Sequence, residues 1–286
     1  MMEIRIYSQP SQEIKDQLFE LVQSCHVTDG TYRLPYLDNA YNFDGDMPTF
    51  FLANLDHQTV GFLSVYADEP GQAEVSVYML PDYRRQGIGS ALLQEFSKIA
   101  EKYDLSQIEY ISEVKFLADH PTFAEKFDYD LKETEIWLEQ AAGNFPEEEK
   151  DDVEVLLGRK EMVADIAAFQ SQIFEMPMDT ALHYASQALE SPDSLLYVLK
   201  KDGQIVASCS VDTSFGSNHL FALAVDQAFQ GQGLGSHLVR SILNDLSGRN
   251  GQVCQIVVEA QNIGALRLYE RLGFKRKSET VYLKRK

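Results

Sequence analysis

Two short glycine-rich segments carry residues whose types and spacing suit the binding of an anionic group. They are Arg-Arg-Gln-Gly-Ile-Gly-Ser at Arg84–Ser90 and Gln-Gly-Gln-Gly-Leu-Gly-Ser at Gln230–Ser236. Each follows an apolar run typical of a strand and leads into a stretch patterned as a helix. In that order, backbone N–H groups and the positive end of a helix dipole converge on one point. Each segment therefore predicts a site for an anion such as a phosphate.

The spacing of the glycines excludes two kinds of nucleotide site. Gly231, Gly233 and Gly235 follow the pattern G-x-G-x-G, whereas a Rossmann dinucleotide site requires G-x-G-x-x-G. A Walker loop ends in Gly-Lys followed by Ser or Thr, and neither segment has a lysine at that place. Both segments instead follow Q/R-x-x-G-x-G/A, which starts at Arg84 in the first and at Gln230 in the second.

A further pattern lies downstream of the second segment. It runs Asn262-x-x-Ala265-x-x-Leu268-Tyr269-x-x-Leu272-Gly273-Phe274. Together with the glycine segments and the order of predicted elements, this pattern resembles the GNAT superfamily of acyl-CoA-dependent N-acetyltransferases. The resemblance covers nearly all of the chain, and two such domains in one chain are similar to the architecture of mycothiol synthase.

The resemblance implies acetyl-CoA (coenzyme A) as a cosubstrate, and no metal. Glycines let the loop amides approach the pyrophosphate of coenzyme A because no Cβ stands in the way. The pantetheine arm is expected to pair with the strand before the loop, where a backbone N–H polarises the thioester carbonyl. The cofactor contacts implied in the second half are Leu223, Ala224, Val225, Gln230, Gly231, Gln232, Gly233, Leu234, Gly235, Ser236 and Asn262. Those implied in the first half are Arg84, Arg85, Gly87, Ile88, Gly89 and Ser90.

The same resemblance implies roles in acid–base chemistry. Tyr269 is expected to protonate the departing thiolate of coenzyme A, the alternative being a tyrosine that packs inward from an amphipathic helix. Asn262 is expected to hold the amide chain of the cofactor, and it also suits the N-cap of the helix that follows it. The base that accepts a proton from the amine stays open between His219 and Glu259, with Asp212 as a third candidate.

The first half departs from the catalytic pattern. Shifted back by 145 or 146 residues, Tyr269 falls on Ala124 or Phe123, and Asn262 likewise falls on an apolar side chain. We therefore expect the first half to keep an anion loop, with its two arginines, but to lack the catalytic groups. Three roles stay open for it: idle binding of coenzyme A, no binding, or shaping of the substrate site.

The two halves of the chain form a repeat. Five residues around the first glycine segment recur 146 positions later, namely Gln86, Gly87, Gly89, Ser90 and Leu92. Ile136-Trp-Leu138 similarly matches Val281-Tyr-Leu283, 145 positions later. We predict an α/β (α+β) fold of two tandem GNAT domains, each a mixed, mostly antiparallel twisted sheet flanked by helices. The N-terminal domain is placed at 1–140, a linker with Gly, Pro and an acidic run at 141–151, and the catalytic C-terminal domain at 152–286.

Composition limits the compartment and the partners. The chain has 286 residues, a formal net charge of −19 and three cysteines, and most of the acidic excess lies in the first half. Such a field repels phosphate backbones, so we expect no nucleic-acid partner. No apolar run is long enough for a membrane span, and the N-terminus lacks the pattern of a signal peptide. With an odd number of cysteines, these features predict a cytoplasmic protein without a membrane partner, whose oligomeric state stays open.

The segment Asp29–Asp46 corresponds to the substrate-facing region of the GNAT family. It is rich in Tyr, Asp and Asn and follows no helical or strand period. Its aromatic and carboxylate groups suit a cationic amine, but equally a solvated acidic loop. We predict transfer of an acetyl group to a primary amine of a small molecule or peptide, with the chemistry in the second half. The alternative is a non-catalytic acyl-CoA-binding sensor or scaffold.

Overall fold

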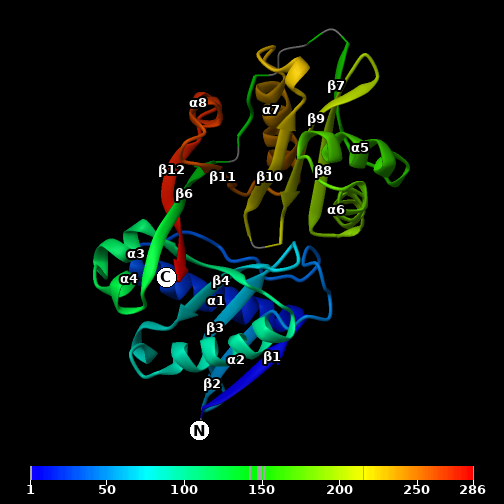
Figure 1. The fold of residues 1–286 in the computed structure, drawn as a ribbon. Coiled ribbons are helices and arrows are strands. Elements are labelled where there is room, and N and C mark those ends of the chain that lie inside the picture. Colours follow the sequence, from blue (N-terminus) through cyan, green and yellow to red (C-terminus); the bar gives the residue numbers. More distant parts are fainter. Residues whose placement is uncertain (1, 142, 147–149, 151, 215, 286) are drawn as a thin grey trace. The chain divides into compact units, whose positions relative to one another are not determined.

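The computed structural model of the protein describes residues 2–141, 143–146, 150, 152–214 and 216–285. The chain forms two compact units, Met1–Ile136 with Ser278–Lys286, and Trp137–Lys277. We refer to them as unit 1 and unit 2 (Figure 1). Of the predicted linker at 141–151, residues 142, 147–149 and 151 lie outside the described residues.

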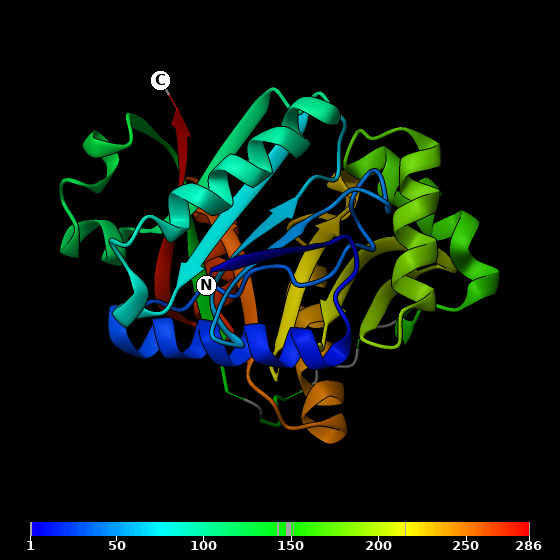
Figure 2. The same cartoon turned by 90° about the horizontal axis from the view of Figure 1, so that it is seen from below.

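Unit 1 is a sheet with helices on both faces. Its elements are β1 (Glu3–Tyr7), α1 (Gln12–Asp29), β2 (Phe50–Leu55), β3 (Gln58–Tyr66), β4 (Gln72–Met79), α2 (Ile88–Lys102), β5 (Gln107–Glu113), α3 (Val114–Asp119), α4 (Phe123–Lys126) and the start of β6 (Tyr129–Gln140). α1 contacts β3 and β4, whereas α2 packs on β2 and β3 from the other face, as Figure 2 shows. Adjacent strands are antiparallel except β4 and β5, which are parallel because α2 connects them.

Unit 2 repeats this plan. Its elements are β7 (Val153–Leu157), α5 (Val163–Ile173), α6 (Met178–Glu190), β8 (Ser194–Lys201), β9 (Gln204–Asp212), β10 (Asn218–Val225), α7 (Leu234–Arg249), β11 (Cys254–Glu259), α8 (Ile263–Arg271) and the start of β12 (Lys275–Arg285). Alternate residues of β8 define its two faces. Leu196 and Val198 pack under α5 and α6, whereas the Tyr197 hydroxyl donates to Asp245 Oδ2 of α7 at 2.5 Å.

Each half completes its sheet with the last strand of the other half. β12, at the end of the chain, pairs with β5 in the register Thr280↔Glu113 to Lys284↔Glu109. β6 lies beside β11, and Gln255 Nε2 of β11 donates to Glu139 Oε2 of β6 at 3.3 Å. The strand order is thus β1-β2-β3-β4-β5-β12 in the first set and β6-β11-β10-β9-β8-β7 in the second.

The described elements confirm the predicted fold class, a mixed and mostly antiparallel arrangement of strands flanked by helices. Ser11 caps α1, since its Oγ accepts the N–H of Ile14 at 3.4 Å. The chain after β5 forms two short helices, α3 and α4, which are separated at Pro121, a residue without an N–H to continue a helix. Among the described residues, no helix is both long and apolar enough to cross a membrane.

Candidate active site

The two glycine segments have the same hydrogen-bonded conformation. At the first position, Gln230 Nε2 donates to the carbonyl of Val225 and Arg84 Nε to that of Met79, both at 3.0 Å. Two residues later, Gln232 and Gln86 each donate to a carbonyl four residues back, at 3.4 and 3.0 Å. In each loop, two side chains thus bond to carbonyls of the preceding turn and strand. They do not use the N–H groups of the loop, which stay available to bind a ligand.

The backbone of both loops turns through the left-handed region just before the helix. Gly233 (φ 75°) and Gly87 (φ 83°) are the N-caps of α7 and α2, and neither helix start receives a side-chain cap. A Cβ at Gly231 or Gly87 would meet nothing within 4 Å, and one at Gly233 would meet only Lys150 Nζ, at 3.7 Å. The starts of α7 and α2 thus have no side-chain cap, and the space beside their N-cap glycines is open, which fits a bound pyrophosphate. Arg85 takes φ 60° where the second loop has Gly231, so the first loop holds a less suitable residue there.

A bulge separates β10 from its neighbour just before the second loop. β10 and β11 pair only from Asn218↔Cys254 to Leu220↔Ile256, and the register against β9 shifts between Phe221 and Ala224. Ala222 at the bulge has φ 48°. Beyond Leu220 the two parallel strands are not paired, so Leu223, Ala224 and Val225 border a gap between strands. In unit 1, β3 and β4 pair from Gly61↔Met79 to Tyr66↔Glu74 without a shift.

Tyr269 lies on the α7 side of this gap. It is 5% exposed on α8 and meets Phe274 edge to face, with ring centroids 5.8 Å apart. Burial raises the pKa of its phenol above the ordinary value, and the thiol of Cys209 adds to the shift. Cys209 is opposite Tyr197 in the β8–β9 pair, which places it on the α7 face, and its Sγ donates to the carbonyl of Phe221 at 3.6 Å. The Tyr269 hydroxyl is therefore protonated at neutral pH and near the bulge.

His219 lies on β10, on the face of the strand opposite to α7. It is opposite Asp212 on β9, which is in turn opposite Ser194, and this row faces α5 and α6. The His219 ring is stacked with Phe221 and lies 5.2 Å from the ring of Trp137 on β6, centroid to centroid. An acid and a base candidate thus flank the bulge from its two faces.

The remaining predicted residues take separate places. Glu259 is exposed at the end of β11. Asp212 accepts the N–H and the hydroxyl of Ser214, at 2.8 and 2.5 Å, and so holds a turn. Asn262 is the N-cap of α8, with Oδ1 accepting the N–H of Ala265 at 3.1 Å. Gly235 packs close to Val225, since a Cβ there would lie 3.4 Å from Val225 Cγ2.

The corresponding gap in unit 1 is bridged by the chain itself. Glu113, at the end of β5 and 5% exposed, accepts the N–H groups of Tyr32 and Arg33 at 2.9 and 3.0 Å. Across the gap on β4, Arg33 Nη1 donates to Ser76 Oγ at 2.9 Å, and the Tyr78 hydroxyl donates to the carbonyl of Arg33 at 2.7 Å. Sequence reasoning missed this bridge, although Glu113 lies 146 residues before Glu259.

Charged groups of the first half are also engaged locally. The guanidinium of Arg84 makes a two-point ion pair with Asp29, both contacts at 2.7 Å. Within the segment Asp29–Asp46, the carboxylate of Asp38 pairs with Lys15 and accepts the N–H groups of Asn39 and Ala40. The negative charge of Asp38 is therefore already paired within unit 1, which leaves less negative charge in this segment to bind a cationic ligand.

Glu74, on β4 beside Arg33, makes the stability of the protein depend on pH. Burial raises the pKa of this carboxyl to about 7, against a lowering by Arg33 and a further rise from Glu135. Because an unfolded glutamate ionises near pH 4.3, the folded state holds the extra proton and stability falls as pH rises to about 7.

We expect Glu74→Gln to raise the free energy of unfolding by about 1–2 kcal/mol more at pH 8 than at pH 5. Urea unfolding at the two pH values measures this difference. Glu101→Gln, the same charge change at an exposed position of α2, is the matched control. A pH dependence that survives in Glu74→Gln would contradict the assignment.

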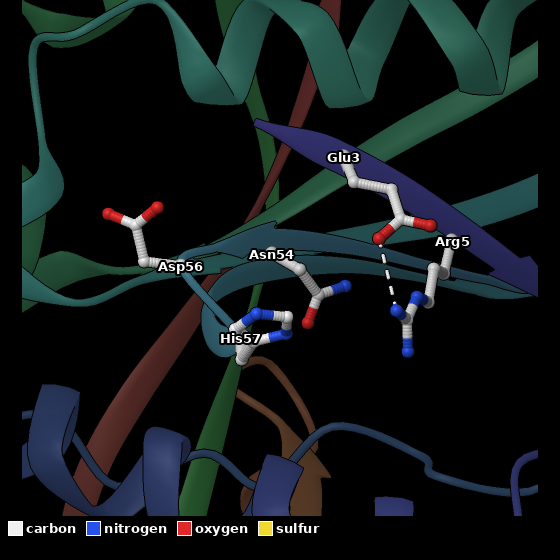
Figure 3. A pocket seen from close by; sticks show the side chains of 5 residues that line it. All are labelled: Glu3, Arg5, Asn54, Asp56 and His57. Carbon is white, nitrogen blue, oxygen red and sulfur yellow. Dashed lines mark hydrogen bonds and ion pairs between the residues drawn. The ribbon is translucent and has the colours of Figure 1, made fainter. Parts of the chain in front are cut away.

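A surface hollow of unit 1 involves none of the predicted site residues. It has a volume of about 280 Å³ and is lined by Glu3, Arg5, Asn54, Asp56 and His57 (Figure 3). The figure shows Arg5 turned toward Glu3, whose Oε2 lies 3.0 Å from Arg5 Nη2. Within the described part of the chain, no three His, Cys, Asp or Glu side chains are grouped so as to hold a metal ion.

Two protein-family models match the chain, one in each half. Residues 15–127 match the model described as acetyltransferase (GNAT) family, and residues 161–284 match the acetyltransferase (GNAT) domain. Among curated proteins, mycothiol acetyltransferase of Clavibacter sepedonicus is 25% identical over 83% of this chain and 81% of its own length. Ribosomal protein bS18 alanine N-acetyltransferase of Escherichia coli (strain K12) is 34% identical over 80 residues. That match spans 28% of this chain and 54% of the relative, about half of its length.

Solved structures share the fold over the whole chain. A GCN5-related N-acetyltransferase from Sphaerobacter thermophilus has a TM-score of 0.74 at 17% identity, covering 99% of this chain and 94% of its own. A tandem GNAT protein from the clavulanic acid biosynthesis pathway has a TM-score of 0.72 at 14% identity, covering 99% and 98%. At sequence identities this low, the similarity shows a shared fold and nothing further.

Proposed function

The chain belongs to the GNAT family of acetyltransferases, with one such domain in each half, and on that premise we propose that it acetylates a primary amine. The acetyl donor is acetyl-CoA, and the chemistry takes place in the C-terminal half. The observation that carries this assignment is the bulge of β10 beside a buried, protonated tyrosine, at the strand that leads into the Gln230–Ser236 loop.

In the proposed reaction, the neutral amine attacks the thioester carbonyl carbon in the gap after Leu220. The C–N bond forms, the C–S bond breaks, and the amine gives up one proton while the sulfur gains one. Tyr269 supplies the proton to sulfur from the α7 face. The backbone at the bulge polarises the carbonyl, since its N–H groups are released from the β11 ladder.

The amine loses its proton on the face of β10 that lies opposite to Tyr269. His219 is the predicted base that lies on the strand of the bulge, whereas Glu259 is exposed at the end of β11. We therefore propose that His219 accepts the proton directly or through water. Asn262 keeps α8, and with it Tyr269, in place by capping the helix.

The amine is proposed to belong to a small molecule or a peptide. By their names, one relative acetylates an alanine of ribosomal protein bS18 and the other is a mycothiol acetyltransferase. In the first half, the Arg33 bridge supports a role without chemistry, because the strands that would hold a thioester are already joined.

The assay that tests this function follows release of the coenzyme A thiol from acetyl-CoA. The panel of acceptors contains amino acids, short peptides, aminoglycosides and polyamines. We expect turnover with at least one acceptor, and acetylated amine in equal amount to free thiol. Tight binding of acetyl-CoA without turnover on any amine would contradict the proposal and favour a non-catalytic acyl-CoA-binding sensor.

A further inference from the structure

Phe145, which precedes β7 in the chain, is held against α7 in unit 2. The N–H of Phe145 donates to Asn244 Oδ1 at 2.7 Å, and Asn244 Nδ2 donates to the carbonyl of Phe145 at 3.0 Å. This reciprocal pair fixes Phe145 on α7, the helix that begins within the Gln230–Ser236 loop. Lys150 lies five residues further along the chain.

The ammonium of Lys150 reaches the glycine loop. Its Nζ lies 3.4 Å from the carbonyl oxygen of Gln232, and 3.7 Å from the place that a Cβ at Gly233 would take. The amides at the start of α7 have no side-chain cap, and the space beside Gly233 is otherwise open. A lysine therefore borders the same space that suits the pyrophosphate.

The second loop has no cation of its own. It carries Gln230 and Gln232, whereas the first loop begins with Arg84 and Arg85. With a net charge of −19, the protein repels an approaching anion unless a positive charge lies close to the site. Lys150 is the single basic residue between Gln140 and Gly158, among acidic neighbours in the sequence.

A solvated lysine that only balances these acidic neighbours would not need to reach the loop. The contact with Gln232 uses one of its three donors and is long for a hydrogen bond to a lysine. The other donors can turn to a phosphate oxygen, and such charge-assisted contacts are stronger than neutral ones.

We propose that Lys150, which precedes β7 in the chain, is a binding residue for the phosphate groups of the acyl donor, in place of a basic residue in the loop. The inference rests on the proposed function, because it assigns a partner to the coenzyme A site of the second half.

The test is calorimetric binding of coenzyme A and of pantetheine, which has the same thiol arm but no phosphate. We expect Lys150→Met to weaken binding of coenzyme A about tenfold and to leave pantetheine unchanged. Lys150→Arg restores binding of coenzyme A to within about threefold, and raised salt narrows the difference between the wild type and Lys150→Met.

Lys160→Met removes the same charge from unit 2 at a distant surface position, where the side chain is 73% exposed and pairs with Glu190. We expect it to bind both ligands like the wild type. Equal affinity of Lys150→Met and the wild type for coenzyme A would overturn the assignment, as would an equal loss for pantetheine. A wild type that binds no coenzyme A would instead contradict the proposed function, together with the role of Lys150 that rests on it.

Discussion

Replacing Tyr269 by phenylalanine is expected to lower kcat about 100-fold with little change in KM for acetyl-CoA. The substitution removes the hydroxyl alone and keeps the ring that packs against Phe274. Because the loop and the bulge stay intact, the ground-state contacts of acetyl-CoA are preserved. The lower kcat therefore reflects a slower step in which the thiolate leaves.

The pH profile gives an independent view of the same phenol. Burial raises the pKa of Tyr269 above its ordinary value near 10, so the acid stays protonated through the usual assay range. We expect the wild type to show no alkaline fall in kcat from this group below about pH 10. Its contribution is present at low pH and is lost only as pH rises through the raised pKa.

Tyr197→Phe is the matched control for this experiment. It removes another buried tyrosine hydroxyl on the α7 face of unit 2, one that donates to Asp245. We expect reduced stability, with kcat within about threefold of the wild type. An unchanged kcat in Tyr269→Phe, with chemistry shown to be rate-limiting by single-turnover kinetics, would remove Tyr269 from the mechanism.

The sequence predicted the parts of the site that depend on local pattern. The order of the elements, the cap at Asn262 and the matched glycine loops all follow from residues that are neighbours in the chain. Gly233 and Gly87 had to be glycines where the backbone turns into a helix with positive φ.

Other features of the fold and the site depend on contacts that no local sequence pattern predicts. The bulge places Ala222 in the left-handed region, although alanine is not a residue that signals this conformation. The bridge between Arg33 and Glu113 joins residues 80 positions apart. The exchange of β6 and β12 could not be predicted from their apolar centres, Ile136-Trp-Leu138 and Val281-Tyr-Leu283, because the two are similar.

The proposed reaction takes place in the second half, and the first half is proposed to be non-catalytic. Gly233 and Gly87 offer a matched pair for testing this claim. Both are N-caps with left-handed backbone, at φ 75° and φ 83°, and both begin a helix after a strand. An alanine at either position costs a similar conformational energy of about 1–2 kcal/mol. Only at Gly233 does the added Cβ stand in the way of a ligand that the reaction needs.

The most direct measurement is kcat/KM for acetyl-CoA in Gly233→Ala and Gly87→Ala, with the melting temperature of each variant. We predict a loss of 10- to 100-fold in Gly233→Ala, as for one or more lost hydrogen bonds to a charged group, and less than about twofold in Gly87→Ala. The two melting temperatures should fall by similar amounts. An equal loss of kcat/KM in both variants, or a larger one in Gly87→Ala, would contradict the placement of the chemistry in the second half.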